Sequence, residues 1–281
     1  MQKTEKIRIF SENNEFQHAD VLKRNRVKRS KHNKFFVEGV NAINLAIEYG
    51  WKIDSFLYSE ESKLSNWAKE ILNRSLAKKH IEMPASLLSK LSDKEESSEL
   101  LALVEMKEDN INRIEIKKDL FVVVIDRASS PGNLGTIIRS CNAFGVDAIL
   151  MTGHSVDLYD PKTIRASVGT LFATNVLRLG SHNDITQWLN TTKETLGEIR
   201  IIGTTVKTEN TIDTFKFNSP LLLLIGNETY GLNQNYKSMC DSLVKIPIHG
   251  AASSLNVACA TSIFLYEISK QIYRNSFIVP F

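Results

Sequence analysis

Hydrophobic residues in the second half of this chain occur in short, continuous runs. The run at residues 121–125, Phe-Val-Val-Val-Ile, is rich in β-branched side chains and is typical of a strand buried in a parallel sheet. Similar runs predict strands at residues 148–151, 201–206, 221–225 and 243–246, with helical periodicities between them. This alternation predicts an α/β fold, in which helices cover a mostly parallel sheet. In such sheets the ligand site lies beyond the carboxyl ends of the strands.

The first third of the chain predicts a separate and smaller α/β domain. Residues 35–39 are expected to form a short strand that ends in a turn. An apolar stripe at residues 40–47 predicts a helix, which Gly50 ends, and residues 53–58 predict another strand. Helical patterns with short strands continue to about Val104.

A charged segment separates the two halves. Residues 107–118 lack a strong apolar period, so we interpret them as a linker, although Ile111, Ile114 and Ile116 could pack on one of the domains. The expected domains are therefore residues 1–106 and 119–281. Two domains suit a length of 281 residues, near which single hydrophobic cores usually stop growing.

Composition is that of an ordinary folded protein, with 42% hydrophobic and 24% charged residues. The N-terminal segment has no apolar core of a secretion signal, and the apolar runs are too short to span a bilayer. We therefore expect a cytoplasmic protein with no membrane partner. Cys141, Cys240 and Cys259 are widely separated and the histidines show no metal-binding spacing, so we expect reduced thiols and no metal.

The net charge of only +3 says little about a partner, but the basic residues are unevenly distributed. Seven of them, with no acidic residue among them, lie close together near the N-terminus: Lys23, Arg24, Arg26, Lys28, Arg29, Lys31 and Lys34. A helix here would be positive almost all round. Both a solvated helix face and a surface that binds RNA phosphates fit this pattern.

Polar residues follow the first and fourth buried strands. Asn133 opens the helix after residues 121–125 and would suit an N-cap, whereas Arg139 lies nearly opposite the apolar face, as a solvated arginine would. Glu228 lies between Gly226 and Gly231, in a turn whose glycines allow close approach of the backbone to a ligand. Taken alone, Glu228 could be an ordinary turn carboxylate.

The segment after the last strand is rich in small residues. Ser253 or Ser254 could be the N-cap of the helix that follows, with Asn256 in its first turn. No GxSxG elbow surrounds Ser254, so it is not a convincing acyl nucleophile. No Walker A sequence is present. No GxGxxG follows the first buried strand, so a nicotinamide-dependent oxidoreductase fits the α/β alternation but not the glycine pattern.

Three segments together resemble the SpoU (TrmH-type) family of RNA ribose methyltransferases, in the SPOUT superfamily. They are SSPGNLGTIIRSCNAFGVDAIL, LLLLIGNETYGLN and VKIPIHGAASSLNVACATSIFLYE, in the family's order and at compatible spacing. IRASVGTLF, between the first two, is also similar, so the resemblance covers residues 119–270. Near the N-terminus, KFFVEGVNAINLAI resembles the substrate-binding domain of many members, a ribosomal-protein-type RNA binder.

The resemblance implies an S-adenosyl-L-methionine-dependent enzyme that methylates a ribose 2′-hydroxyl. It also implies a C-terminal trefoil knot, an exception to the rule that chains are unknotted, and a site completed across a homodimer. Ribosomal RNA is the first expectation for the substrate, because of the separate N-terminal domain, and transfer RNA is the second. A knotted base methyltransferase and a non-catalytic RNA-binding protein are the alternatives.

The resemblance also assigns residues to the site. It places Asn133 and Arg139 in the first motif, Glu228 in the second, and Ser254 and Asn256 in the third. The joint presence of Arg139, Glu228 and Asn256 argues against a decayed, non-catalytic protein. Cofactor contacts are expected largely from the backbone near four residues: Leu224, Gly226, Ile246 and Leu255.

A ribose hydroxyl is a poor nucleophile at neutral pH, so the enzyme must align it and help to remove its proton. We expect Arg139 to grip the phosphate beside the target ribose and to stabilise the developing alkoxide. A guanidinium has a pKa above ~12, so we expect a phosphate oxygen or water to accept the proton. Asn133, Ser254 and Asn256 would bond to ribose or phosphate, and Glu228 would orient Arg139 or brace its loop.

Overall fold

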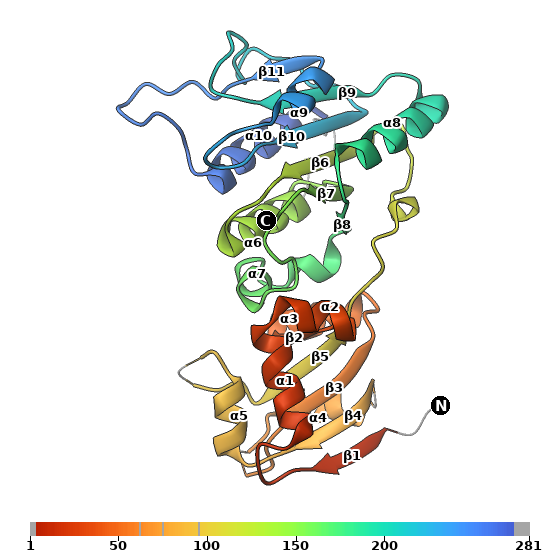
Figure 1. Cartoon of the computed structure of the whole chain (residues 1–281), viewed down its shortest axis with the longest axis vertical. Coiled ribbons are helices and arrows are strands. Elements are labelled where there is room, and N and C mark those ends of the chain that lie inside the picture. The colour runs from red at the N-terminus through yellow and green to blue at the C-terminus, as the bar shows by residue number, and fades with distance from the viewer. Residues whose placement is uncertain (1–3, 62, 75, 95, 273–281) are drawn as a thin grey trace. The chain divides into compact units, whose positions relative to one another are not determined.

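The computed structural model describes residues 4–61, 63–74, 76–94 and 96–272. Residues 1–3 and 273–281, the outer ends of the two expected domains, lie outside the described residues. The contacts divide the chain into two compact units (Figure 1). Unit 1 contains residues up to Glu108 together with Asp157–Ala173, and unit 2 contains Asp109–Val156 and the residues from Thr174 onward.

Unit 1 is built on a five-stranded mixed sheet in the order β1-β4-β3-β5-β2. β1, β4 and β3 are parallel, and β5 runs antiparallel to both β3 and β2. Its elements along the chain are β1 (Glu5–Arg8), α1 (Asn14–Arg24), α2 (Arg26–His32), β2 (Lys34–Glu38), α3 (Val40–Glu48), β3 (Ile53–Tyr58), α4 (Asn66–Asn73), β4 (Ala77–Glu82), α5 (Ala85–Leu91), β5 (Leu100–Glu105), α7 (Pro161–Ala166) and the 3-10 turn η2 (Thr170–Ala173).

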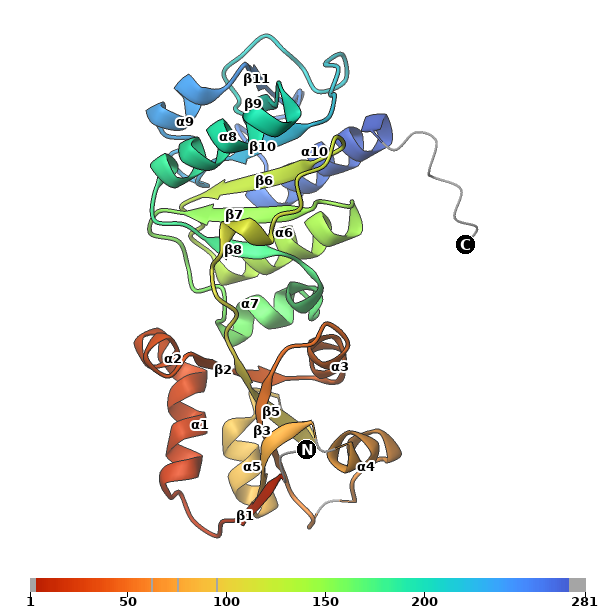
Figure 2. The ribbon, with the colours of Figure 1, turned by 90° about the vertical axis from the view of Figure 1, so that its right-hand side faces the viewer.

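Helices cover both faces of this sheet. The inward faces of α1 and α5 pack on one side, where residues such as Leu22 and Leu88 form a core with Leu57 and Ile81 of the sheet. Figure 2 shows α3 and α4 on the opposite side from α1 and α5. The side chains of a strand alternate between the two faces, so the neighbours of Leu57 and Ile81 in β3 and β4 point toward the α4 side.

The segment Asp157–Ala173 packs within unit 1 although it follows β7 in the chain. Tyr159 stacks on Phe35 with ring centroids 4.4 Å apart, and the Trp51 indole donates a 2.9 Å hydrogen bond to the Phe172 carbonyl. Gly169 (φ +84°) lies so close to α3 that a Cβ there would be 2.8 Å from the Cα of Ala42. The linear pattern of the sequence did not indicate this exchange, and the expected boundaries at residues 106 and 119 stay a prediction.

Unit 2 contains a six-stranded sheet, parallel throughout, in the order β11-β9-β10-β6-β7-β8. Its elements along the chain are the 3-10 turn η1 (Ile111–Arg113), β6 (Phe121–Asp126), α6 (Pro131–Ala143), β7 (Ala148–Thr152), β8 (Val176–Arg178), α8 (His182–Leu196), β9 (Arg200–Thr204), β10 (Leu221–Ile225), α9 (Gln234–Met239), β11 (Ser242–Val244) and α10 (Val257–Ile272). The expected mostly parallel α/β architecture is therefore confirmed.

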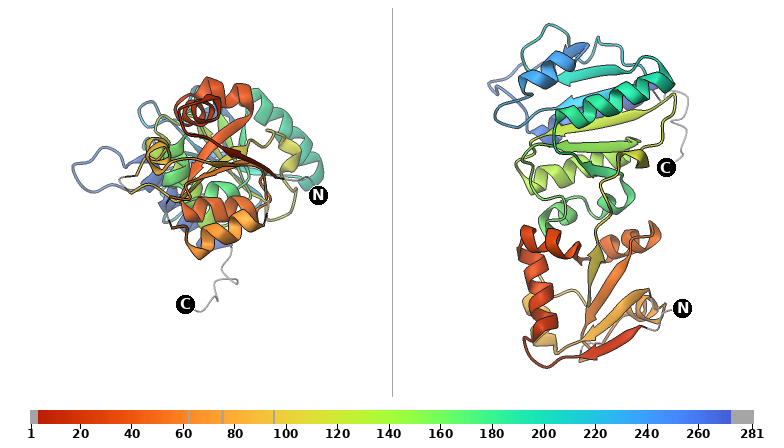
Figure 3. Two further views of the ribbon diagram at one scale, coloured as in Figure 1. Left: turned by 90° about the horizontal axis from the view of Figure 1, so that it is seen from below. Right: turned by 45° about the vertical axis from the view of Figure 1, so that its right-hand side comes forward.

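Helices cover both faces of this second sheet as well. Trp188 and Leu189 of α8 and Tyr236 of α9 pack with Val122, Val124 and their neighbours on one face. Figure 3 shows α6 and α10 together on the other face, where the two helices pack against each other. The expected linker contributes three isoleucines to the core on the α8 side: Ile111, Ile114 and Ile116. These isoleucines therefore pack on unit 2.

No described helix is long and apolar enough to cross a membrane. Within the described ranges, no group of three or more His, Cys, Asp or Glu side chains is arranged to hold a metal ion.

Candidate methyl-transfer site

The strand order of the sheet in unit 2 reverses direction between β6 and β10. From β6 the chain adds β7 and then β8 on one side, whereas β10, β9 and β11 lie on the other. β6 and β10 are parallel neighbours, with Ile125 opposite Ile225, so the loops that follow them leave the same edge side by side. Such a reversal point is where open α/β sheets bind ligands.

A cavity of about 460 Å³ lies at this edge, which is within the usual range for small-molecule sites. It is lined by residues that follow β9, β10 and β11 and by the start of α10. Gly226, Ile246 and Leu255, expected to contact a cofactor, line the cavity, as do Glu228 and Ser254.

Leu224 is not among the residues that line the cavity. Its side chain is fully buried in β10, and its carbonyl accepts a 3.1 Å hydrogen bond from the Thr204 hydroxyl. Ile225, the last residue of the strand, lines the cavity in its place. The expected cofactor contact from the backbone near Leu224 stays a prediction.

The turn after β10 depends on Gly226. A Cβ at this position would lie 2.2 Å from the backbone nitrogen of Leu232, so no other residue fits without moving the chain. Asn227 and Gly231 exchange backbone hydrogen bonds of 3.2 and 2.9 Å, which close the turn. The turn is therefore narrow and presents Glu228 at its tip.

Hydrogen bonds join the three motif loops into one network. The Glu228 carboxylate accepts from the Ser129 hydroxyl at 2.5 Å and from the Asn133 amide at 3.2 Å. The Asn133 side-chain oxygen in turn accepts from the Asn256 amide at 3.1 Å. The network therefore joins one residue from each of the three motifs, namely Asn133, Glu228 and Asn256. Arg139 and Ser254 are not part of it.

Neither Asn133 nor Ser254 caps a helix. Ser130 is the N-cap of α6, which leaves the Asn133 side chain available for Glu228. Asn256 is the cap of α10, because its side-chain oxygen accepts from the backbone nitrogens of Ala258 and Cys259 at 2.9 and 3.3 Å. The N-cap interpretations of Asn133 and Ser254 are therefore wrong, and Asn256 caps its helix while also bonding to Asn133.

The hydrogen bonds also act on the protonation of Glu228. Partial burial tends to raise the pKa of its carboxyl, but the donors from Ser129, Asn133 and the backbone outweigh burial and hold the pKa below its usual value. Glu228 is therefore an anion at neutral pH. As an acceptor of two side-chain hydrogen bonds, it braces the loops, which is one of the two roles expected for it.

Arg139 lies apart from this network. It is exposed on α6, and its side chain makes no hydrogen bond or ion pair with any residue that the structure describes. It does not contact Glu228, so the alternative in which Glu228 orients Arg139 is not seen within the single chain.

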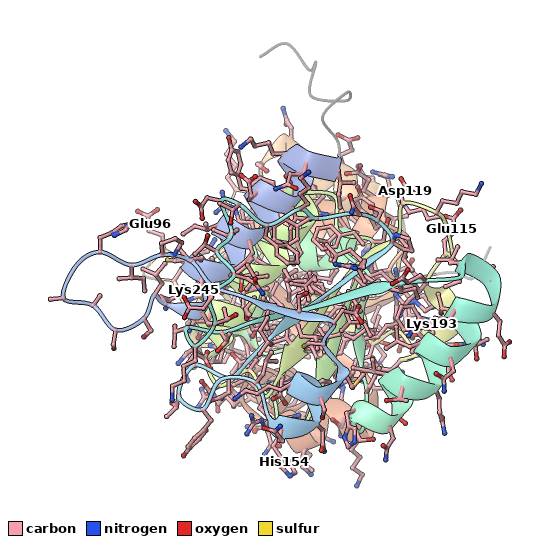
Figure 4. All side chains as sticks on the ribbon, turned by 90° about the horizontal axis from the view of Figure 1, so that it is seen from above. Glu96, Glu115, Asp119, His154, Lys193 and Lys245 are labelled. Atoms are coloured by element: carbon pink, nitrogen blue, oxygen red, sulfur yellow. The ribbon has the colours of Figure 1, made fainter. Side chains whose placement is uncertain are left out.

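Ser254 lies in the loop that connects β11 to α10. Residues 246–255 make no hydrogen bond with any other described residue, and Ser254 and Leu255 are exposed. Figure 4 shows this loop, which begins beyond the labelled Lys245, extending away from the sheet. The site is therefore ordered on the side of β6 and β10 and open on the side of this loop.

A second buried network supports the same loops, and the sequence analysis missed it. Asp126 at the end of β6 is only 2% exposed and pairs with Arg127 at 2.9 Å, while also accepting from the Asn233 amide at 3.2 Å. The hydrogen bonds that Arg127 donates to the Asp126 carboxylate raise the pKa of Arg127. Arg127 (φ +55°) also donates to the Gly231 carbonyl at 3.2 Å, which links the β6 and β10 loops.

Other residues of the cavity were also missed, chiefly Thr204 at the end of β9 and Thr205 directly after it. The signal for them was available, because residues at the carboxyl end of every parallel strand of such a sheet are candidates. The pair Asp126-Arg127 carried the same signal, since two opposite charges directly follow the apolar run at residues 121–125.

The seven basic residues near the N-terminus do not form one continuous helix face. Asn25 caps α2 and separates it from α1. The Arg29 guanidinium is 2% exposed and bonds to Asp157 at 2.7 Å, so Arg29 is structural and its expected role in RNA binding is wrong. Lys23 pairs with Asp93, Arg24 with Asp20 and Lys34 with Asp54, whereas Arg26, Lys28 and Lys31 are exposed.

Comparison with known proteins agrees with this geometry. Residues 120–266 match the SpoU rRNA methylase family, and residues 13–102 match the SpoU L30e-like domain. A 23S rRNA (uridine(2479)-2′-O)-methyltransferase of Streptomyces viridochromogenes is 41% identical over 265 residues, which are 94% of this chain and 92% of that protein. The 23S rRNA (guanosine(2553)-2′-O)-methyltransferase RlmP of Bacillus subtilis is 24% identical, over 86% of this chain and 90% of RlmP.

Solved structures show the same similarity. The SpoU methyltransferase AviRb from Streptomyces viridochromogenes, crystallised with AdoMet, superimposes with a TM-score of 0.88 at 40% identity and covers 94% of this chain and 99% of its own. An AdoMet-bound rRNA methyltransferase from Sinorhizobium meliloti superimposes with a TM-score of 0.85 at 25% identity, over 97% and 99% of the two chains.

Proposed function

This chain belongs to the SpoU rRNA methylase family, and we propose that it transfers a methyl group from S-adenosylmethionine to a ribose 2′-hydroxyl of 23S ribosomal RNA. One observation carries the choice of substrate. The relative that is 41% identical spans nearly the whole of both chains, N-terminal domain included, and its name specifies 2′-O-methylation of 23S rRNA at a uridine. We therefore expect a uridine of 23S rRNA as the target.

The cavity suits the cofactor. Ile225, Ile246 and Leu255 supply apolar walls, and residues at or just after the carboxyl ends of β9, β10 and β11 line much of the rest. Gly226 keeps the cavity wall free of a side chain where a Cβ would collide with the backbone. The cofactor supplies a methyl group that its sulfonium already activates, so the protein has only to align the acceptor and assist its proton.

Arg139 is the residue that we assign to the acceptor. Its guanidinium is exposed and bonds to no other described residue, so it is available to hold the phosphate beside the target ribose. The planar fork of arginine suits a phosphate and fixes its orientation. Held there, Arg139 stabilises the alkoxide that develops on the 2′-oxygen, while a phosphate oxygen or water accepts the proton.

Asn133, Ser254 and Asn256 complete the acceptor side. The Asn133 amide is held between Glu228 and Asn256, which fixes its orientation toward a substrate ribose or phosphate. Ser254 has no hydrogen bond to another described residue and belongs to the exposed loop. We propose that substrate and cofactor together order this loop over the cavity.

We further propose that two copies assemble through α10. Its outward residues Ile263 and Tyr266 are 40% and 56% exposed, Cys259 lies one turn before Ile263, and Leu255 of the neighbouring loop is 39% exposed. A row of exposed apolar side chains along one helix is typical of a subunit interface. A partner subunit there would lie beside the loop 246–255 and would complete the site.

The connections of unit 2 support a knotted C-terminus. The segment between β9 and β10 contacts the chain on both sides of the loop 246–255: Thr211 bridges to Lys245, and the Phe217 backbone nitrogen donates to Gln271 at 2.9 Å. We propose that the final segment passes under this connection as a trefoil knot. With ribosomal RNA as its substrate, the enzyme acts in the cytoplasm.

The function is tested by incubating the purified chain with labelled S-adenosylmethionine and, separately, with 23S rRNA, 16S rRNA and total tRNA. We expect label only in 23S rRNA, at one nucleotide whose 3′ phosphodiester becomes resistant to alkali, because that cleavage needs a free 2′-hydroxyl. Label in a base after nucleoside digestion would overturn the ribose assignment, and label in tRNA alone would overturn the substrate.

A further inference from the structure

Unit 1 carries a groove of about 1520 Å³ that no motif of the sequence indicated. Residues of β1, β3, β4 and α4 line it. Lys6 of β1 lies opposite His80 of β4, and His80 lies opposite Phe56 of β3, so these side chains project from the same face of the sheet. The groove is larger than the usual range of roughly 300–1000 Å³ for small-molecule sites, which favours an extended ligand.

Positive charge dominates the lining of the groove. Two glutamates, Glu5 and Glu60, face six lysines: Lys6, Lys52, Lys63, Lys69, Lys78 and Lys79. Lys78 pairs with Glu105 and Lys79 with Glu15. The other four lysines are exposed, and their ammonium groups form no ion pair or hydrogen bond with any residue that the structure describes.

The floor between the lysines is apolar. Ile53, Leu64, Leu72 and Leu76 contribute to it, and Leu76 is 37% exposed. His80 also lines the groove, is 4% exposed, and its Nε2 has no hydrogen-bond partner among the described groups. Burial lowers the pKa of His80, so its ring is neutral and adds no charge to the floor.

An anionic polymer with planar apolar parts matches this surface. Ammonium groups distributed along a groove neutralise successive phosphates, and apolar side chains between them can pack against bases. The basic segment around α2 offers less free charge, because Lys23, Arg29 and Lys34 are engaged with carboxylates.

We propose that this groove binds the backbone of the substrate RNA through Lys6, Lys52, Lys63 and Lys69, and that it is the main RNA-binding surface of unit 1. The proposal rests on the proposed function for the identity of the RNA. It adds which face of unit 1 holds that RNA, and its residues are distinct from those assigned to methyl transfer.

The test uses the full chain with all four free groove lysines replaced by Gln (K6Q, K52Q, K63Q and K69Q) and a 23S rRNA transcript as the probe. The matched control replaces four exposed lysines outside the groove, Lys94, Lys118, Lys162 and Lys193, the last on α8 (Figure 4). In a salt titration, log affinity for RNA is plotted against log salt concentration. The magnitude of the slope should fall by about 0.7 for each phosphate that is no longer neutralised, or ~3 for all four. The control should keep the slope of the wild type.

Lysine footprinting provides a second measurement that does not depend on how the variant folds. The wild-type chain is acylated with and without the 23S rRNA transcript, and modification at each lysine is quantified. The proposal expects RNA to protect the four groove lysines and not the four control lysines. Unprotected groove lysines, or protection confined to Lys28 and Lys31, would overturn it.

Calorimetric binding of S-adenosylmethionine separates this proposal from the proposed function. Groove variants should bind the cofactor as the wild type does. If the transcript protects the groove lysines but receives no methyl group, the groove is upheld and the assignment of 23S rRNA as substrate fails. If the transcript is methylated while the groove lysines stay unprotected, the groove proposal fails and the assignment of 23S rRNA as substrate is upheld.

Discussion

Asn256 shows how one amide can serve two structural tasks at the site. Its oxygen caps α10 through the nitrogens of Ala258 and Cys259, and its nitrogen donates to Asn133. An aspartate could make the cap but has no donor for the Asn133 oxygen, and a serine is too short to do both. The residue type at this position is therefore set by both the fold and the site.

Arg139 provides the sharpest prediction at the scale of the residue. It is exposed and has no partner in the described structure, so Arg139→Ala should change the melting temperature little. Turnover in a single-turnover assay with saturating RNA should fall by orders of magnitude, with cofactor binding retained. Arg139→Lys should rescue poorly, because a point charge lacks the planar fork. Near-wild-type turnover of a folded Arg139→Ala chain would remove this residue from the mechanism.

At the scale of the element, three loops from different strands depend on one carboxylate. Glu228 can accept from Ser129 and Asn133 at once only while both of its oxygens are acceptors. Alanine in its place would present no acceptor to either donor, whereas glutamine could still accept from Asn133 and donate to the Ser129 hydroxyl. The loss of both bonds in the alanine variant would release Asn133, and through it Asn256.

Glu228→Ala and Asn256→Ala should therefore be coupled. Each alone should weaken cofactor-dependent methylation, and the double variant should lose less than the sum of the two single losses, with a coupling of about 0.5–3 kcal/mol. The measurement is kcat/KM for the wild type, both single variants and the double variant. Ser238→Ala on α9, whose hydroxyl bonds only within its helix, serves as the uncoupled control. Additive losses would show that the loops act independently.

The basic segment near the N-terminus shows how an element changes the role of a residue. A run of one sign of charge predicts an exposed face, but α2 turns Arg29 inward, where it donates to the Leu22 and Lys23 carbonyls as well as to Asp157. Sequence reasoning had no means of finding Asp157, because the acid lies 128 residues away in the chain. A buried charge of this kind is retained only when a partner and further hydrogen bonds satisfy it.

Arg29→Ala should therefore destabilise unit 1 rather than merely weaken RNA binding. Removing one member of a buried ion pair leaves the other uncompensated and costs about 3–5 kcal/mol. Denaturant unfolding should show this loss, and Asp157→Ala in the same chain should restore part of it. Lys28→Ala, on the exposed side of α2, should be neutral. An Arg29→Ala chain as stable as the wild type would show that the pair contributes nothing to the fold.

At the scale of the whole molecule, the sequence predicted what depends on local pattern. The runs at residues 121–125 and 221–225 are β6 and β10, because fully buried strands need no polar alternation. The motifs after them do meet, as expected of adjacent parallel strands. Long-range packing was beyond the pattern: the docking of Asp157–Ala173 in unit 1, and the short strand β8 of only three residues.

The same limit applied to the RNA-binding surface. Basic residues that are adjacent in sequence drew attention to residues 23–34. The lysines of the groove instead come from β1, β4, α4 and the segments before β3 and α4, and only the folded sheet brings them together. Sequence proximity is a poor guide to a surface that a mixed sheet assembles. The charge of a folded face depends on which side chains are already paired.

The proposed assembly gives the last prediction. Stable homodimer interfaces are rich in apolar side chains, and α10 exposes Cys259, Ile263 and Tyr266 along one side while its other side packs on α6. An aspartate at Ile263 would have to be buried without a partner if two copies met there. Ile263→Asp should therefore be a monomer by light scattering at concentrations where the wild type is a dimer. It should also bind S-adenosylmethionine more weakly, because the loop 246–255 beside α10 would lose its support.

Phe10→Asp, at a 77% exposed position of unit 1, is the matched control and should stay dimeric. A wild-type chain that is monomeric and fully active, or an Ile263→Asp variant that stays dimeric, would rule out α10 as the subunit interface.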